Sequence, residues 1–234
     1  QTYNCREPGI YRFYRLPDYF HQRLILPGTI NEALEFIGYL WAYGKLDNQD
    51  ELDYYSLLKT SIPFLDCYQL TLIAQKIFQK LDIQCRLVMA KHGGKWNGYD
   101  DSHCLIEFHD KGKWFVYDPS FNCCFTQNKK RVNLYEAILG LQNEAIEIEK
   151  LPGNQSCGPW RHKGHDLSFW ISERVASEIA LIDWYKRVMQ VPLIISNNQG
   201  KYYFVKESVQ ARYLEQFTHL FDGLNSSQFK NEFY

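Results

Sequence analysis

The segment DSHCLIEFHDKGKWFVYDPS, residues 101–120, has the pattern of a β-hairpin with a histidine at one end and an Asp-Pro pair at the other. Apolar and polar residues alternate on both sides of a polar turn, as in two paired strands. A four-residue loop, 109–112, pairs Phe108 with Lys113 and, counting outward along antiparallel strands, places His103 opposite Asp118. We therefore predict that this imidazole and this carboxylate are neighbours.

A carboxylate beside one ring nitrogen fixes the tautomer and orientation of an imidazole, and it leaves the other nitrogen for a third group. The best candidate for that group is Cys67, in DCYQLTLIAQKIFQKL, residues 66–81, whose apolar residues repeat at helical spacing. Asp66 and Gln69 form a capping-box pattern, which predicts that the helix begins at Cys67.

A helix N-terminus favours the thiolate of Cys67 through its free N–H groups and its dipole. The charge of Asp66 opposes ionisation unless that carboxylate is engaged in capping. Cys67, His103 and Asp118 then form a nucleophile, a base and an orienting group. Backbone N–H groups of the helix face a developing oxyanion, so the arrangement predicts acyl-transfer chemistry.

The rest of the chain predicts one α+β domain, with a core of about 29–125 and a helical and hairpin extension of about 130–234. A helix begins after Thr29, and IQCRLVMA, 83–90, alternates like a strand. Further helices are predicted over 134–148, 167–189 and 207–221. A loop is predicted over 151–165, and a hairpin turns at 196–200.

Composition limits the partners that we expect. The 234 residues carry 26 Lys and Arg against 27 Asp and Glu, which gives no electrostatic reason to expect nucleic acid or an anionic membrane. No apolar run is long enough to span a membrane and no signal-peptide pattern is visible, although a leader removed before Gln1 leaves the localisation open. Seven cysteines, an odd number, favour reduced thiols and a reducing compartment such as the cytoplasm.

Residues 55–122 resemble the transglutaminase-like superfamily. The likeness rests on Cys67 opening an amphipathic helix, on KLDIQCRLV leading into a strand, on His103 starting the next strand, and on GKWFVYDP closing the hairpin with Asp118. Members include transglutaminases, peptide N-glycanases and bacterial proteins that resemble cysteine peptidases. The resemblance implies a cysteine helix packed on an antiparallel sheet, and thioester chemistry on an amide of a peptide or protein.

Three functions remain open on these residues. The first is a thiol hydrolase, such as a cysteine peptidase, in which water resolves the acyl-enzyme. The second is a transglutaminase, in which an amine takes the acyl group and water is kept away. The third is a binding or scaffold domain that has the fold without the chemistry. The absence of a clustered acidic site argues against a calcium-dependent transglutaminase.

The loop 91–102 precedes His103 and carries Trp96 and Tyr99 among several glycines. We predict that it is a flap whose two rings contact the substrate; the alternative is that the rings pack on the sheet. Elsewhere, Cys157, His162 and His165 lie close in sequence but lack a fourth metal ligand, and Cys123 and Cys124 read as adjacent buried thiols. We expect no metal and no cofactor, and the sequence leaves the oligomeric state open.

Overall fold

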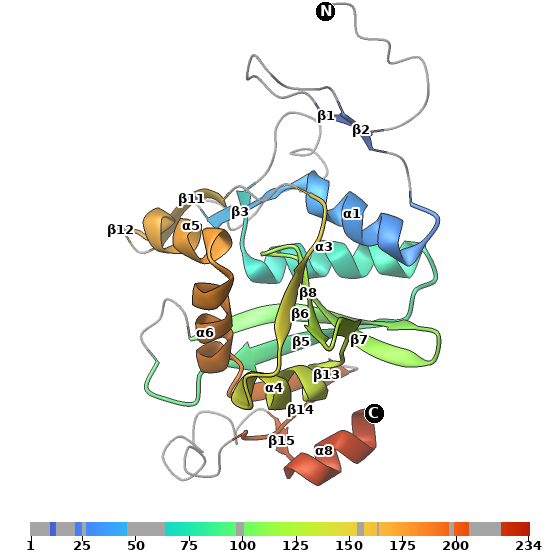
Figure 1. Ribbon diagram of the computed structural model, residues 1–234, viewed down its shortest axis with the longest axis vertical. Coiled ribbons are helices and arrows are strands. Elements are labelled where there is room, and N and C mark those ends of the chain that lie inside the picture. Colours follow the sequence, from blue (N-terminus) through green and yellow to red (C-terminus); the bar gives the residue numbers. More distant parts are fainter. Residues whose placement is uncertain are drawn as a thin grey trace, which may run out of the picture.

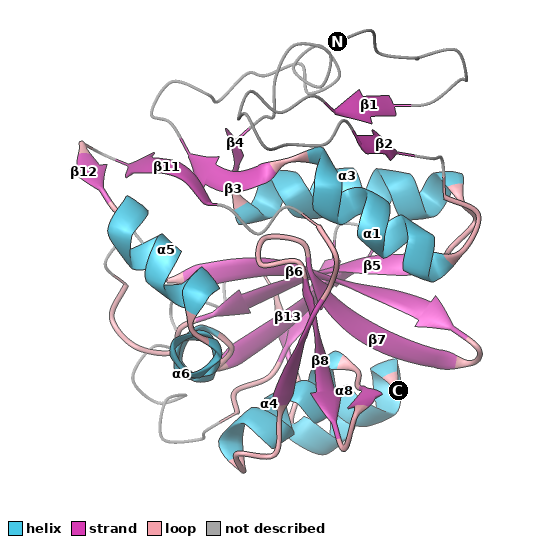
Figure 2. Ribbon diagram, turned by 45° about the horizontal axis from the view of Figure 1, so that its top comes forward, coloured by secondary structure: helices cyan, strands magenta, loops and turns pink. Residues whose placement is uncertain are grey.

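The computed structural model describes residues 10–12, 22–24, 27–45, 64–96, 101–153, 157–162, 164–196, 199–205 and 221–234. Its architecture is mixed α+β, as the sequence predicts, with a long sheet between layers of helices (Figures 1 and 2). A smaller sheet and a short hairpin, β1 (Ile10–Arg12) with β2 (Gln22–Leu24), lie on the side of the first helices.

The long sheet is antiparallel throughout, except for the parallel pair at one edge. Its strands, in spatial order, are β10 (Glu147–Lys150), β8 (Cys123–Gln127), β7 (Lys113–Asp118), β6 (Ser102–Asp110), β5 (Cys85–Lys91), β13 (Val191–Ser196), β14 (Gln199–Tyr202) and β15 (Asp222–Gly223), with β9 (Lys130–Arg131) paired to β8. Consecutive chain segments build β5 to β8. Strand β13 arrives from much later in the chain and pairs with β5.

Helices α1 (Ile30–Leu40) and α3 (Cys67–Lys80) cover one face of this sheet, and α4 (Leu134–Gln142) and α8 (Ser226–Phe233) lie on the other side (Figure 2). The predicted caps of the first two helices are confirmed, because Thr29 and Asp66 each form a capping box. Phe78 of α3 packs against Phe108 of β6, with ring centroids 5.5 Å apart. Helix α3 thus lies on the sheet face to which Phe108 belongs.

The last pair of helices, α5 (Ser168–Ala176) and α6 (Glu178–Val188), stands at one end of the long sheet (Figure 1). Next to α5 is the smaller sheet, with the order β12 (His165–Asp166), β11 (Cys157–His162), β3 (Ala42–Lys45) and β4 (Phe64–Leu65). Strand β4 leads through Asp66 directly into α3. The smaller sheet therefore positions the start of the helix that carries Cys67.

Several predicted elements differ from the structure. The helix predicted over 134–148 ends at Gln142, because Glu144 adopts a positive φ of 57° and the chain continues into β10. The helix predicted over 167–189 is interrupted at Ser177, whose extended backbone caps α6. The loop predicted over 151–165 contains β11 and β12, and α8 is not predicted. The helix predicted over 207–221 lies almost entirely outside the described residues.

The C-terminal part of the chain contributes strands to the long sheet and side chains to the same buried cluster. Strand β13 joins the centre of the long sheet, and β10 forms one of its edges. Side chains of α4 and α6, such as Ile138 and Leu181, share one buried cluster with residues of α1 and α3. Val191, Leu193 and Ile194 of β13 are themselves buried. The segments 29–125 and 130–234 thus form one core. Strand β5 pairs with β6 on one side and with β13 on the other.

A buried ion pair ties α8 to the sheet. Arg86 of β5 places Nε 2.8 Å from Oε2 of Glu107 of β6, whose side chain is fully buried. The hydroxyl of Tyr234 lies 2.8 Å from both carboxylate oxygens, and the backbone N–H of Leu134 donates to Oε1 over 2.8 Å. Arg86 also lies over the ring of Trp114 at 4.1 Å. Glu107 therefore joins the sheet, α4 and the end of α8.

Candidate active site

Cys67 is the first residue of α3, as the capping pattern predicts. The side chain of Asp66 accepts from the backbone N–H of Gln69 over 3.0 Å, and the Gln69 side chain accepts in return from the N–H of Asp66 over 3.0 Å. The other oxygen of Asp66 lies 3.5 Å from Nζ of Lys45. The carboxylate next to the thiol is thus engaged in capping and paired with a cation, which weakens its opposition to a thiolate.

His103 and Asp118 are in direct contact. Nε2 of His103 lies 2.6 Å from Oδ2 of Asp118, and both side chains are buried. The register that led to this prediction is wrong by two residues, because β6 and β7 pair Asp110 with Lys113 around a two-residue turn. His103 and Asp118 are therefore diagonal neighbours. An error of two residues leaves every side chain on its predicted face, so the contact survives it.

The carboxylate of Asp118 accepts from four donors. Oδ1 accepts from the backbone N–H of Ser120 over 2.7 Å and from that of Phe121 over 3.4 Å. Oδ2 accepts from His103 and also from the hydroxyl of Tyr185, which comes from α6. A buried carboxylate that accepts this many hydrogen bonds is held in one orientation.

The thiol of Cys67 is close enough to the side chains of His103 and Cys104 for both to act on its pKa. Since Nε2 of His103 is held by Asp118, Nδ1 is the ring nitrogen left for the thiol. Side chains alternate along β6, so Cys104 lies on the same face as Phe108, the face against which α3 packs. His103 precedes Cys104 in the strand, and both act on the thiol at the start of α3.

Burial and neighbouring groups shift the pKa values of both His103 and Cys67. Burial alone lowers the pKa of His103, but the charge and hydrogen bond of Asp118 raise it to about 10. The pKa of Cys67 is raised well above its usual value by the hydrogen bond with Cys104 and by burial, while His103 lowers it. The neighbouring Cys104 therefore opposes the thiolate that the helix end was predicted to favour.

Aromatic rings enclose the imidazole. The ring of Trp184 stands edge-on to His103 with centroids 4.6 Å apart, and Phe121 lies at 5.9 Å. Trp184 and Tyr185 were both missed by sequence reasoning. They lie in a helix whose apolar residues repeat at ordinary spacing, so nothing in the sequence distinguishes them from core residues.

Burial raises the pKa of three further cysteines. Burial raises the pKa of Cys85 to about 11 and that of Cys124 to about 12. The pKa of Cys123 is raised well above its usual value by burial and by Asp118, and its Sγ lies 3.5 Å from the hydroxyl of Tyr185. In the described part of the chain no three metal-ligating side chains gather at one point.

Of the two rings predicted to contact the substrate, the structure describes Trp96. Trp96 packs against a small cluster on β13 and β14 that includes Leu193 and Tyr202, and its ring lies 4.6 Å from Nζ of Lys91. This is the arrangement that the packing alternative predicts. Tyr99 lies outside the described residues, so the flap stays a prediction.

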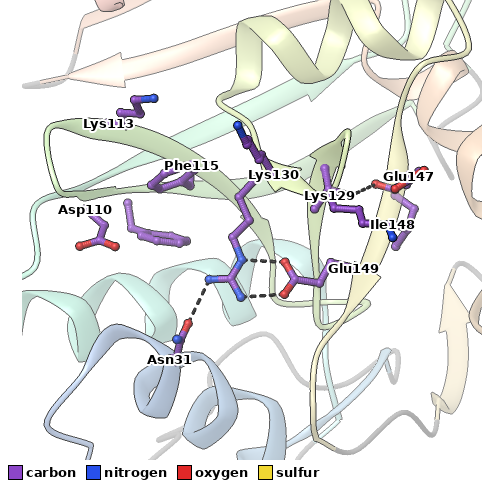
Figure 3. Close-up of a pocket in the computed structure, with 12 residues that line it drawn as sticks. Asn31, Asp110, Lys113, Phe115, Lys129, Lys130, Glu147, Ile148 and Glu149 are labelled. Atoms are coloured by element: carbon purple, nitrogen blue, oxygen red, sulfur yellow. Dashed lines mark hydrogen bonds and ion pairs between the residues drawn. The ribbon is translucent and has the colours of Figure 1, made fainter.

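A separate hollow of about 680 Å³ lies at the turn end of the hairpin (Figure 3). Arg131 crosses it, with Nε 2.6 Å from Oε2 of Glu149 and Nη1 3.1 Å from Oδ1 of Asn31. Lys113 and Asp110 line its rim. None of Cys67, His103 and Asp118 lines this hollow, so it is not part of the candidate site.

Comparison of the chain with protein family models, curated proteins and solved structures found no match. Within the described residues, no helix has both the length and the apolar character needed to cross a membrane.

Proposed function

We propose that this protein is a thiol-dependent acyl-transfer enzyme that hydrolyses an amide of a peptide or protein through Cys67, His103 and Asp118. The proposal rests on one observation: the thiol at the start of α3 lies beside a buried His–Asp pair. Cys67 is 36 residues from His103 and 51 residues from Asp118 in the sequence. The resemblance to the transglutaminase-like superfamily supports the same chemistry.

In the first half of the reaction, the thiolate of Cys67 attacks the amide carbonyl carbon and forms a C–S bond. The carbonyl oxygen becomes an oxyanion, which faces backbone N–H groups at the start of α3. The C–N bond then breaks, and Nδ1 of His103 gives its proton to the leaving amine. The products of this half are a thioester on Cys67, a free amine and a neutral imidazole.

In the second half, neutral His103 takes a proton from water while the water oxygen attacks the thioester carbon. The C–S bond breaks, a carboxylic acid leaves, and Cys67 and His103 return to their starting forms. Asp118 stays charged throughout and stabilises the protonated imidazole. With the pKa of His103 at about 10 and that of Cys67 raised, acylation accelerates with increasing pH as Cys67 ionises.

The test uses p-nitrophenyl acetate as an acyl donor and intact-protein mass spectrometry as the readout. We expect one acetyl group on Cys67 in the wild type, none there in Cys67→Ala, and strongly slowed acetylation in His103→Ala. Cys124→Ala is the matched control, because it removes a buried thiol that does not contact His103. Equal acetylation of Cys67→Ala and wild type would overturn the proposal and favour the binding-domain function.

A second measurement separates hydrolysis from transfer. Peptides that carry glutamine and lysine side chains are incubated with the protein, with and without a primary amine, and analysed by mass spectrometry. Chain cleavage or conversion of glutamine to glutamate supports hydrolysis. Incorporation of the amine in place of either product would overturn the hydrolytic assignment in favour of a transglutaminase.

A further inference from the structure

Tyr185 connects α6 to Asp118, the candidate orienting carboxylate. Its side chain is fully buried, and its hydroxyl donates to Oδ2 of Asp118, the same oxygen that contacts His103. The ring is held edge-on to Phe125 at 4.6 Å and to Phe121 at 6.3 Å. The phenol is thus fixed from several sides and its hydroxyl meets the carboxylate.

The direction of the hydrogen bonds follows from the strength of the acceptors. A hydroxyl has one proton, and a carboxylate is a far better acceptor than a thiol sulfur. Tyr185 therefore donates to Asp118, and the thiol of Cys123, 3.5 Å away, donates to the oxygen of Tyr185. Burial raises the pKa of Tyr185 well above its usual value, so the phenol stays a donor over the pH range in which enzymes work.

This chain of donors acts on the carboxylate in two ways. Oδ1 is fixed by two backbone N–H groups, while Oδ2 accepts from His103 and Tyr185. The phenol fixes the angle at which Oδ2 meets the imidazole. It also shares the negative charge of Asp118, which weakens the hold of the carboxylate on the proton of His103.

We propose that Tyr185 is a positioning residue of the active site, which acts through Asp118 to orient His103 and to ease the release of its proton. This inference rests on the proposed function and deepens it, because it assigns the helix α6 to the catalytic machinery. The step it serves is deacylation, in which neutral His103 must take a proton from water.

Several other titratable groups lie around Asp118, His103 and Tyr185, and each can affect a measured pH profile. They are Tyr43 of β3, Tyr117 of β7, Cys123 and Cys124 of β8, Cys67 of α3, and Arg174 of α5, which lies near Tyr185. A change confined to the hydroxyl of Tyr185 leaves all of them in place.

The experiment compares Tyr185→Phe with two controls. Tyr203→Phe removes a buried hydroxyl that has no hydrogen-bond partner in the described structure. Tyr117→Phe removes a buried hydroxyl that donates to Asn122 over 3.0 Å. The first matches the chemical change and the second matches the loss of a buried hydrogen bond. The protein is acetylated on Cys67, and loss of the acetyl group is followed by mass spectrometry across a range of pH.

We expect Tyr185→Phe to slow deacylation by roughly tenfold to a hundredfold, the range for losing a hydrogen bond to a charged group. The midpoint of the pH profile moves to higher pH, because His103 holds its proton more tightly. Both controls keep the wild-type midpoint. A purely structural role lowers the amount of active protein but leaves the midpoint in place, so an unchanged midpoint and rate in Tyr185→Phe overturn the inference.

Failure of the proposed function has a different signature. If the wild type forms no acetyl-Cys67, or if His103→Ala deacylates as fast as the wild type, the triad itself is at fault. Should Tyr185→Phe fail to fold, Cys123→Ala replaces it, because that change removes the donor to the phenol and keeps the phenol itself. A smaller shift of the midpoint in the same direction supports the inference, and no shift overturns it.

Discussion

His103 and Asp118 contact each other diagonally across the hairpin, with Nε2 and Oδ2 2.6 Å apart, rather than from directly paired positions. The strand β7 ends at Asp118, and the chain turns back so that Ser120 and Phe121 donate to the same carboxylate. The geometry of the turn therefore aims the carboxylate at the imidazole, and the ladder of backbone hydrogen bonds does not need to reach His103.

Asp118→Asn is expected to lower the pKa of His103 from about 10, because the charge of Asp118 is lost while burial still lowers the pKa and only Cys67 still raises it. A raised pKa in the folded state gives stability that is complete below about pH 6.5 and is lost as the pH rises to about 10. The fall in unfolding free energy over this window becomes shallower in the variant. Urea denaturation at several pH values measures it; equal slopes for both proteins would contradict the coupling.

Activity should respond to the same substitution. An amide side chain neither balances an imidazolium nor fixes the correct tautomer, so we expect acylation of Cys67 to slow by at least about a hundredfold. If Asp118→Asn acylated Cys67 at the wild-type rate, Asp118 would have no part in the reaction.

Cys67 is expected to be alkylated before the other described cysteines. It is partly exposed and lies beside a protonated imidazole, whereas Cys104, Cys123 and Cys124 are buried. Iodoacetamide at less than one equivalent, followed by peptide mapping, gives the order of labelling. First labelling of any of the three buried thiols at neutral pH would contradict the assignment of the nucleophile.

Cys104→Ala is expected to increase the reactivity of Cys67 at neutral pH. The hydrogen bond with Cys104 is the largest cause of the raised pKa of Cys67, so its removal lowers that pKa. The pH profile of Cys67 alkylation should therefore move to lower pH. Cys124→Ala provides the comparison, because it creates a similar space away from Cys67. An unchanged or upward-shifted profile in Cys104→Ala would show that the second thiol does not restrain the first.

Trp96→Ala is expected to lower the unfolding free energy by about 2 kcal/mol, less than for a fully buried tryptophan, because Trp96 is half-buried. Thermal denaturation measures this, and acylation per folded molecule is measured alongside it. The flap interpretation requires the opposite pair of results, with a stable protein and reduced turnover. Tyr99→Ala, tested separately, shows whether the other ring of the loop serves the substrate.

Glu107→Gln is expected to lower the unfolding free energy by about 3–5 kcal/mol, because it leaves the charge of Arg86 without its partner inside the protein. Glu149→Gln is the matched control: its pair with Arg131 is much more exposed, and we expect a loss below about 1 kcal/mol. Acylation per folded molecule should be unchanged in both. Similar losses in the two variants would show that burial does not decide the strength of these pairs.

The features that the sequence predicts well are local. The capping box of Asp66 and Gln69 sets the start of α3 within the chain itself, so the position of Cys67 follows without any tertiary information. The predicted hairpin register is wrong because the turn has two residues, Lys111 and Gly112, and not four. Lys111 adopts a positive φ of 48°, in a position where asparagine or aspartate is more usual, so the sequence does not show this turn. A period of two kept His103 and Asp118 on one face in spite of this error.

The features that could not be predicted depend on distant segments. Tyr185 reaches Asp118 only because β13 pairs with β5 and brings the end of α6 to the sheet, and neither contact leaves a local pattern. The break at Ser177 involves neither glycine nor proline, so helical periodicity runs through it. Cys104 lies against Cys67 through strand alternation combined with the placement of α3, which the sequence alone does not give.

The late arrival of β13 has a consequence during synthesis of the chain on the ribosome. Translation delivers Cys67, His103 and Asp118 well before β13 and α6, and until then β5 is the outermost strand on its side of the sheet. An unpaired strand edge invites pairing with other chains. The candidate nucleophile Cys67 is thus synthesised while the edge of β5 is still open, and the strand that completes the sheet also closes that edge.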